Sequence, residues 1–159
     1  RTHMIETFRR AHDHRGSGFV EIYQNCNVFN DGAFAKVTAR DARGHMLIPL
    51  VHGRPVRFGA HDERGVVVDR QGRVRIVDVA DVGEDAILVH DEGREEPDLA
   101  FMLSRLARGP HEPTPIGVFR AVERPDYGRL VNDQVLAASA AEGPGDLAQL
   151  LASGTTWQV

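Results

Sequence analysis

The chain of 159 residues contains one cysteine, one lysine, few aromatic residues and no long apolar run. A single cysteine excludes a disulfide within the chain, which is typical of a protein in the reducing cytoplasm. The apolar runs are short and interrupted by charged residues, so we expect no membrane-spanning segment and no signal peptide. The net charge of −4, with arginines scattered along the chain, gives no reason to expect a nucleic-acid partner.

Composition places the chain in the ordinary globular class, because 42% of its residues are hydrophobic and 26% are charged. Its length suits about one domain with a core of its own. Apolar spacing predicts a helix over residues 4–15 that ends at Gly16, then a strand over 18–23. That strand is apolar enough to be buried on both faces of a parallel sheet. A polar loop over 24–32 and a short helix over 33–40 follow.

The middle of the chain changes to short β-branched runs separated by turn residues, which predicts a small antiparallel meander outside the parallel sheet. The expected strands are 46–51, 56–58, 65–68 and 74–77, with 86–90 as a further candidate.

Helical signals return near Pro97, which suits a first turn, and the apolar spacing continues to Leu106. Prolines keep residues 109–115 extended, and we expect a strand over 116–122 to follow. We expect two more helices near the end of the chain, over 127–138 and 147–151.

Cys26 follows the first expected strand and lies among polar residues, in a loop rather than a core. Three interpretations stay open from the residues alone. The thiol could be a small buried side chain, a nucleophile activated by His52 or His90, or one ligand of a metal cluster. In the third case the side-chain amides of Gln24, Asn25 and Asn27 could donate to sulfur.

Asn30 and Asp31 are the secondary candidates, because they follow the cysteine on the same loop. The alternative is that Asp31 and Gly32 simply reverse the chain in an Asx turn. Other chemistry is not indicated: the sequence has no Cys-x-x-Cys or His-Glu-x-x-His spacing and no glycine-rich phosphate-binding motif.

Several strings resemble one known family, the β subunits of 2-oxoacid:ferredoxin oxidoreductases, and most closely the 2-oxoglutarate type. The most specific strings are Tyr-Gln-Asn-Cys at 23–26 and Phe-Asn-Asp-Gly-Ala-Phe at 29–34. Weaker ones are Phe-Val-Glu-Ile at 19–22, His-Asp-Glu at 90–92 and Pro-Ile-Gly-Val-Phe-Arg at 115–120, so the resemblance spans about residues 1–135. Many members have a proline after the cysteine, where this chain has Asn27.

The resemblance implies an α/β fold: the C-terminal part of a thiamine-diphosphate-binding fold over 1–42, then a β-rich insertion and an α+β C-terminal extension over 43–159. It implies that Cys26 is the last thiolate of a [4Fe-4S] cluster, with Asn30 and Asp31 in the cofactor region. The other three cysteines and the motif that holds thiamine diphosphate and Mg²⁺ would lie earlier in the subunit. We therefore expect no tight cofactor binding by this chain alone.

The implied activity of the intact enzyme is oxidative decarboxylation of a 2-oxoacid, with 2-oxoglutarate favoured, to an acyl-CoA with reduction of ferredoxin. The implied partners are an α subunit, ferredoxin, the 2-oxoacid and coenzyme A. Two other classes remain open. The chain could be a non-catalytic subunit-interface module, or a small enzyme with Cys26 as its nucleophile.

Overall fold

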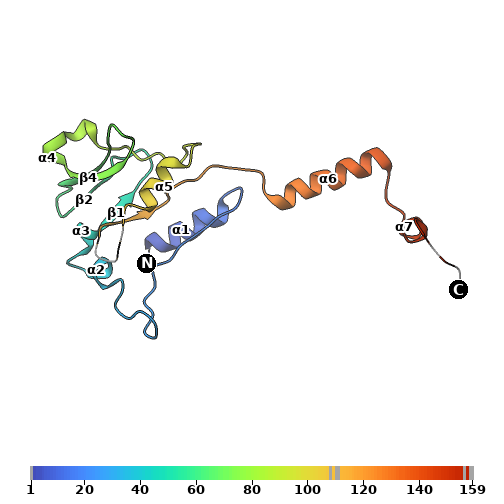
Figure 1. Cartoon of the computed structure of the whole chain (residues 1–159), viewed down its shortest axis with the longest axis horizontal. Helices are drawn as coiled ribbons and strands as arrows, with labels where there is room; N and C mark the ends of the chain where they lie inside the picture. Colours follow the sequence, from blue (N-terminus) through green and yellow to red (C-terminus); the bar gives the residue numbers. More distant parts are fainter. Residues whose placement is uncertain (1, 108, 110–111, 156, 158–159) are drawn as a thin grey trace. The chain divides into compact units, whose positions relative to one another are not determined.

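The computed structural model describes residues 2–107, 109, 112–155 and 157 (Figure 1). It divides into two compact units. The first runs to residue 122 without residues 15–17, and the second combines residues 15–17 with the chain from 123 onward. The architecture mixes helices with one parallel and one antiparallel sheet, which confirms the α/β class at this level. The more specific prediction of a thiamine-diphosphate-binding fold, with a boundary near residue 42, stays a prediction.

The antiparallel sheet has the order β2 (Arg57–Phe58), β3 (Arg64–Val68), β4 (Val74–Asp78). Its β3–β4 turn is closed by the Asp69 carboxylate, which accepts the backbone N–H groups of residues 71 and 73. Gly72 takes the positive φ of +75° that this turn requires. The meander is thus confirmed for three of its four expected strands.

The prediction that residues 46–51 belong to the meander is wrong. β1 (Leu47–Leu50) pairs in parallel with β5 (Thr114–Gly117), in a separate sheet of two strands. Ile48 and Leu50 are buried and Pro49 between them is exposed, so β1 has one face on the core. Turn residues after β1 suggested a hairpin, but parallel pairing depends on a contact distant in sequence that local patterning does not report. β5 also begins earlier than the predicted 116–122.

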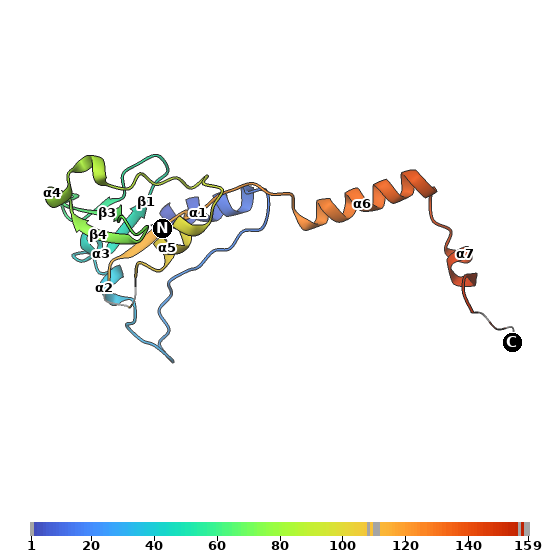
Figure 2. The ribbon, with the colours of Figure 1, turned by 45° about the horizontal axis from the view of Figure 1, so that its top comes forward.

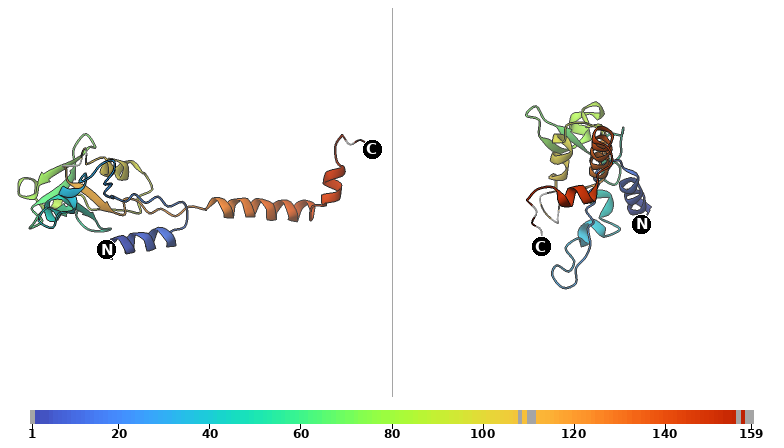
Figure 3. Two further views of the ribbon diagram at one scale, coloured as in Figure 1. Left: turned by 90° about the horizontal axis from the view of Figure 1, so that it is seen from below. Right: turned by 90° about the vertical axis from the view of Figure 1, so that its right-hand side faces the viewer.

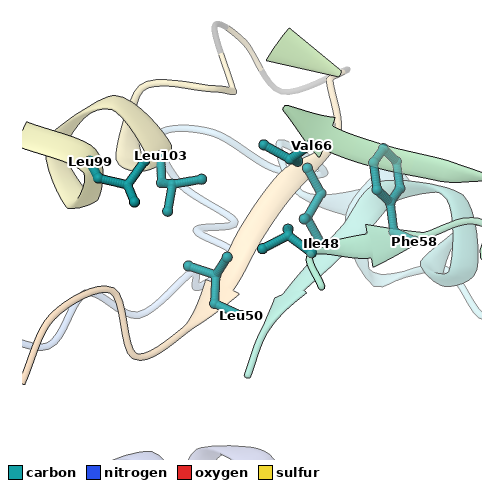
Figure 4. Packing of buried hydrophobic residues seen from close by; sticks show 7 residues of the cluster. Ile48, Leu50, Phe58, Val66, Leu99 and Leu103 are labelled. Carbon is teal, nitrogen blue, oxygen red and sulfur yellow. The ribbon is translucent and has the colours of Figure 1, made fainter. Parts of the chain in front are cut away.

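The core of the first unit lies between these sheets and α5 (Asp98–Ser104) (Figure 4). Leu99 and Leu103 are four residues apart, so both project from one face of α5. Each fully buried aliphatic side chain contributes roughly 1.5–3 kcal/mol to folding. The buried cluster consists of Ile48, Leu50, Val56, Phe58, Val66, Leu99 and Leu103.

Four of the six remaining helices match predicted positions, with shifted bounds. Figure 2 labels each of the six, and Figure 3 shows α6 as one continuous helix. They are α1 (Thr2–Asp13), α2 (Ala35–Thr38), α3 (Arg43–Met46), α4 (Val79–Val82), α6 (Tyr127–Glu142) and α7 (Leu147–Ala152). The sequence did not predict the single turns α3 and α4. Within the described part of the chain, no helix is long and apolar enough to cross a membrane.

Two other predicted strands are wrong. Residues 86–90 form the end of a 3₁₀ turn (Glu84–Ala86) and a single bridge between Val89 and Pro55. Residues 18–23 are extended but belong to no strand, and Phe19 is 90% exposed. A strand is stable when its backbone groups pair with neighbours. Among the described residues none pairs with this segment, so its apolar side chains have no sheet to pack on.

Candidate functional site

The lone cysteine lies at the base of a tight chain reversal (the blue loop below α2 in Figure 1). Cys26 and Asn30 form an isolated antiparallel bridge, and the Asn30 N–H donates to the Cys26 carbonyl at 3.0 Å. The thiol is partly exposed. This excludes the interpretation of Cys26 as a buried core side chain in this structure.

Backbone N–H groups of the reversal affect the Cys26 thiol. Hydrogen bonding from the N–H of Phe29, then from that of Val28, lowers the pKa of the thiol below its ordinary value, with a smaller effect of Asn30 and a small opposing effect of desolvation. Hydrogen bonds to the charged form favour that form, so this loop stabilises a thiolate. The thiolate is the form in which cysteine binds metals or attacks electrophiles.

The side chain of Asn25 holds the loop in shape. Its Nδ2 donates to Asn27 Oδ1 at 2.7 Å and to Asp31 Oδ1 at 2.8 Å, and its Oδ1 accepts the Gly32 N–H at 2.8 Å. Gly32 has a φ of +74° at this point. Asn25 and Asn27 were expected as possible donors to sulfur, but the described contacts bind them to each other, and the donors to sulfur are backbone groups.

A ring pair lies outside this polar network. The rings of Tyr23 and Phe34 stack with centroids 4.9 Å apart and planes 10° from parallel. Desolvation of the partly buried hydroxyl, with a smaller effect of the Glu21 carboxylate, raises the pKa of Tyr23. Stacked aromatic pairs favour the close approach of the two segments that carry them. The stack therefore supports the Asn25 contacts in joining the two ends of the loop.

The two secondary candidates make different contacts, and the described contacts join only Asn30 to Cys26. The Asn30 backbone N–H donates to the Cys26 carbonyl and makes a small contribution to the lowered pKa of the thiol. Asp31 accepts from the Asn25 side chain, as an organising residue of the loop. Sequence reasoning missed the central role of Asn25. Its signal is an amide six residues before an Asp-Gly pair, a spacing that lets one side chain bridge both ends of a loop.

The loop that follows Cys26 exposes two large apolar side chains, which we call the apolar rim. Val28 is 81% exposed and Phe29 is 90% exposed. Large apolar side chains grouped at the surface mark interaction sites more often than isolated ones do. The loop therefore combines a thiol of lowered pKa with two exposed apolar side chains.

The two histidines considered as bases for Cys26 make their contacts elsewhere. His90 is buried, 1% exposed, and its Nε2 lies 2.8 Å from the Val118 carbonyl oxygen. His52 Nδ1 accepts the Glu92 N–H at 3.3 Å and lies 3.6 Å from Asp91 Oδ1. Backbone amides, not an imidazole, lower the pKa of the thiol. The structure thus shows a thiolate site without an adjacent general base among these candidates.

The donor set tests whether a metal cluster fits. Cys26 provides one thiol whose pKa is lowered by backbone N–H groups, and cysteine thiolates are the ligand type that iron–sulfur clusters use. The described residues contain no group of three or more His, Cys, Asp or Glu side chains able to hold a metal ion. The loop therefore fits as one corner of a cluster site, whose other ligands would have to come from outside the described residues.

Comparison with curated proteins shows that the chain is similar to a subunit of an oxidoreductase. The relative is 2-oxoglutarate oxidoreductase subunit KorB of Mycobacterium tuberculosis (strain ATCC 25618 / H37Rv), to which the chain is 39% identical over 161 residues and 100% of its own length. The chain spans 43% of the length of that relative. This match confirms the resemblance to β subunits of 2-oxoacid:ferredoxin oxidoreductases of the 2-oxoglutarate type. No family model matches the chain, and no solved structure matches it.

Proposed function

We propose that this chain is part of the catalytic β subunit of an enzyme that oxidatively decarboxylates a 2-oxoacid, with 2-oxoglutarate favoured, to an acyl-CoA. In this proposal Cys26 would be one of the ligands of a [4Fe-4S] cluster, and that cluster would supply electron transfer to ferredoxin. The support from sequence is the identity of 39% to a 2-oxoglutarate oxidoreductase subunit. The support from structure is the thiol that accepts backbone N–H groups on an exposed loop.

The N–H groups around Cys26 carry this proposal. Hydrogen bonds to a cluster sulfur are among the means by which a protein sets its reduction potential. The loop provides them from the backbone, so they do not depend on the identity of the side chains at 28, 29 and 30. The Asn25 amide binds Asp31 and Gly32 at the far end of the loop, and in this proposal it keeps the reversal in the shape that lowers the pKa of Cys26.

Asn30 and Asp31 are proposed as cofactor-region residues that act through the loop. Asn30 would hold the thiolate through its N–H, and Asp31 would position the Asn25 side chain. Thiamine diphosphate, when bound with Mg²⁺, supplies the carbanion chemistry of decarboxylation. We propose that its ligands lie outside this chain, and no step of binding it is assigned to the residues described.

The proposed partners are an α subunit and ferredoxin, with the 2-oxoacid and coenzyme A as substrates. The relative is itself a named subunit, which supports assembly with a second chain. The apolar rim formed by Val28 and Phe29 is the surface of the loop best suited to being covered in such an assembly.

The test is Cys26→Ser in the complete enzyme assembled with its partner subunit. Serine keeps the size of the side chain but replaces a soft thiolate by a poor ligand for iron. We expect loss of the [4Fe-4S] absorbance and electron-paramagnetic signal and loss of ferredoxin reduction, with thiamine diphosphate still bound. The matched control is Phe29→Ala, which removes an exposed ring but keeps the backbone N–H, and it should retain the cluster.

The same experiment separates the other two classes. A nucleophile with the lowered pKa of Cys26 would lose chemistry in the serine variant without any change in a cluster spectrum. A non-catalytic interface module would show no iron and no acid-labile sulfide in the assembled wild-type complex. A serine variant with wild-type cluster absorbance and ferredoxin reduction would refute the role proposed for Cys26.

A further inference from the structure

The second unit contains an open cleft with a volume of about 390 Å³. We call it the arginine cleft, because three arginines are among the six residues that line it. Cavities of roughly 300–1,000 Å³ are the usual size for small-molecule sites. The lining residues are Arg15, Glu123, Arg124, Pro125, Asp126 and Arg129.

Two segments distant in sequence build the cleft. The backbone N–H of Arg124 donates to the carbonyl of Arg15 at 3.0 Å, which joins the loop after α1 to the segment before α6. Arg124 Nη1 also donates to the carbonyl of Glu123 at 3.0 Å. Arg15 therefore lines the same cleft as Arg124 and Arg129, which local sequence could not have shown.

The first turn of α6 is already capped from within the chain. Asp126 Oδ1 accepts the backbone N–H of Arg129 at 2.8 Å. The helix end is therefore satisfied by its own carboxylate, and the side chains rather than the helix N-terminus give the cleft its binding capacity.

The side chain of Arg129 is weakly engaged. Its Nε lies 3.8 Å from Asp133 Oδ2, and the two side chains are 71% and 61% exposed. An exposed ion pair at this separation contributes little, at most about 1 kcal/mol. A guanidinium has five N–H donors in a planar fork, so Arg129 can turn to a better acceptor in the cleft.

Positive charge in this unit is concentrated at the cleft. The chain from residue 130 to 157 contains three carboxylates, at Asp133, Glu142 and Asp146, and no lysine, arginine or histidine. The whole chain carries a net charge of −4. Three guanidiniums on one cleft of such a chain form a local site for anions against an acidic background.

We propose that the arginine cleft binds the phosphate groups of a small polyanion. Glu123 and Asp126 also line the cleft, so its formal charge is modest, and a single small anion gains little there. A diphosphate can bridge several guanidiniums at once and accept paired hydrogen bonds from each fork, which is the geometry that arginine serves best. This site is independent of Cys26, so it does not depend on the function proposed for the loop.

The test uses the full chain and inorganic pyrophosphate, with binding measured by calorimetry at low salt. Wild-type protein should show saturable binding at one site. Arg15→Gln and Arg129→Gln should each weaken binding by about tenfold or more, because charge-assisted hydrogen bonds are lost. The matched control is Arg70→Gln in the exposed β3–β4 turn, which makes the same change of charge outside the cleft and should keep wild-type affinity.

A second pair of probes identifies the group that is recognised. ADP should bind and adenosine should not. The affinities of ADP and pyrophosphate are then compared, and the tighter ligand shows whether the cleft prefers the diphosphate of a nucleotide or a free diphosphate. Arg129→Lys keeps the charge without the fork, so it should bind less tightly than wild type while far-ultraviolet circular dichroism stays unchanged. Absence of saturable binding, equal weakening by Arg70→Gln, or equal binding of adenosine would each overturn the proposal.

Discussion

At the scale of single residues, Cys26 differs from an ordinary surface cysteine because backbone groups rather than charged side chains lower its pKa. The donors belong to a five-residue reversal, so the effect depends on the folded loop and is lost in the unfolded chain. Because the pKa of Cys26 is lower in the folded chain than in the unfolded chain, ionisation of the thiol stabilises the fold at high pH. This stabilisation is lost as the pH falls through the pKa of the folded chain.

The pH dependence of alkylation tests this property. The rate of reaction of Cys26 with iodoacetamide follows the thiolate, so its midpoint should lie at lower pH in the folded chain than in the chain unfolded by urea. Phe29→Pro removes the N–H that contributes most and should move the midpoint upward, whereas Phe29→Ala should not. Coincident midpoints for the folded and unfolded chains would contradict the hydrogen bonding described at the sulfur.

The sequence predicted the loop around Cys26 better than the contacts within it. The polar neighbours of Cys26 correctly indicated a loop, whereas the role of Cys26 in a site stays a prediction. The donors to sulfur could not be identified from side-chain types, because they are main-chain groups directed by the reversal over 26–30. The contacts of Asn25 likewise depend on a loop closure that no local propensity encodes.

At the scale of elements, the parallel pair β1–β5 depends on a glycine. Gly117 has a φ of +121°, and a Cβ at this position would lie 2.6 Å from the Leu50 carbonyl oxygen. Leu50 is the register partner of Gly117 and is part of the core. The end of β5 can therefore approach β1 only because this residue lacks a side chain.

Gly117→Ala should separate the end of β5 from β1. Backbone strain at a positive φ alone costs roughly 1–3 kcal/mol, and the clash with Leu50 adds to it. Chemical denaturation should show a loss of stability of at least about 1 kcal/mol. The control is Gly145→Ala, at a position where a Cβ would meet no atom within 4 Å, and this variant should unfold like wild type.

Elements defined by local patterns were predicted well, and those that depend on distant partners were not. The β-branched runs around Gly72 gave the meander β2–β3–β4, and apolar spacing gave α5 and α6. β1 was placed in the wrong sheet because its partner lies more than sixty residues later, at Thr114–Gly117. Residues 18–23 have the composition of a buried strand, but composition does not supply the neighbours that a strand needs.

At the scale of the whole molecule, the first unit has a compact core while several large apolar side chains of the chain remain uncovered. Phe19 and Phe29 are each 90% exposed, and α1 has no buried residue. Such exposure is unusual for a chain that works alone. It is consistent with a chain that spans 43% of its curated relative.

We expect the isolated chain to self-associate through these side chains. Light scattering should show species larger than a monomer that increase with concentration, and Phe19→Ser combined with Phe29→Ser should reduce them. The control is Phe101→Ser, another exposed phenylalanine, on α5, at 62% exposure. A wild-type chain that stays monomeric at high concentration would show that the exposed rings do not drive association.

The Asn25 side chain also bears on the chemical ageing of the protein. Aspartyl–glycyl bonds isomerise when the glycine nitrogen attacks the aspartyl carboxyl carbon to form a cyclic imide, which opens to isoaspartate. Here the Gly32 N–H and the Asp31 carboxylate are both bound to one amide, that of Asn25, at 2.8 Å each. The attacking nitrogen and its target are thus held in a fixed arrangement, so the bond next to the cysteine loop should isomerise slowly in the folded chain and quickly once Asn25 is replaced by alanine.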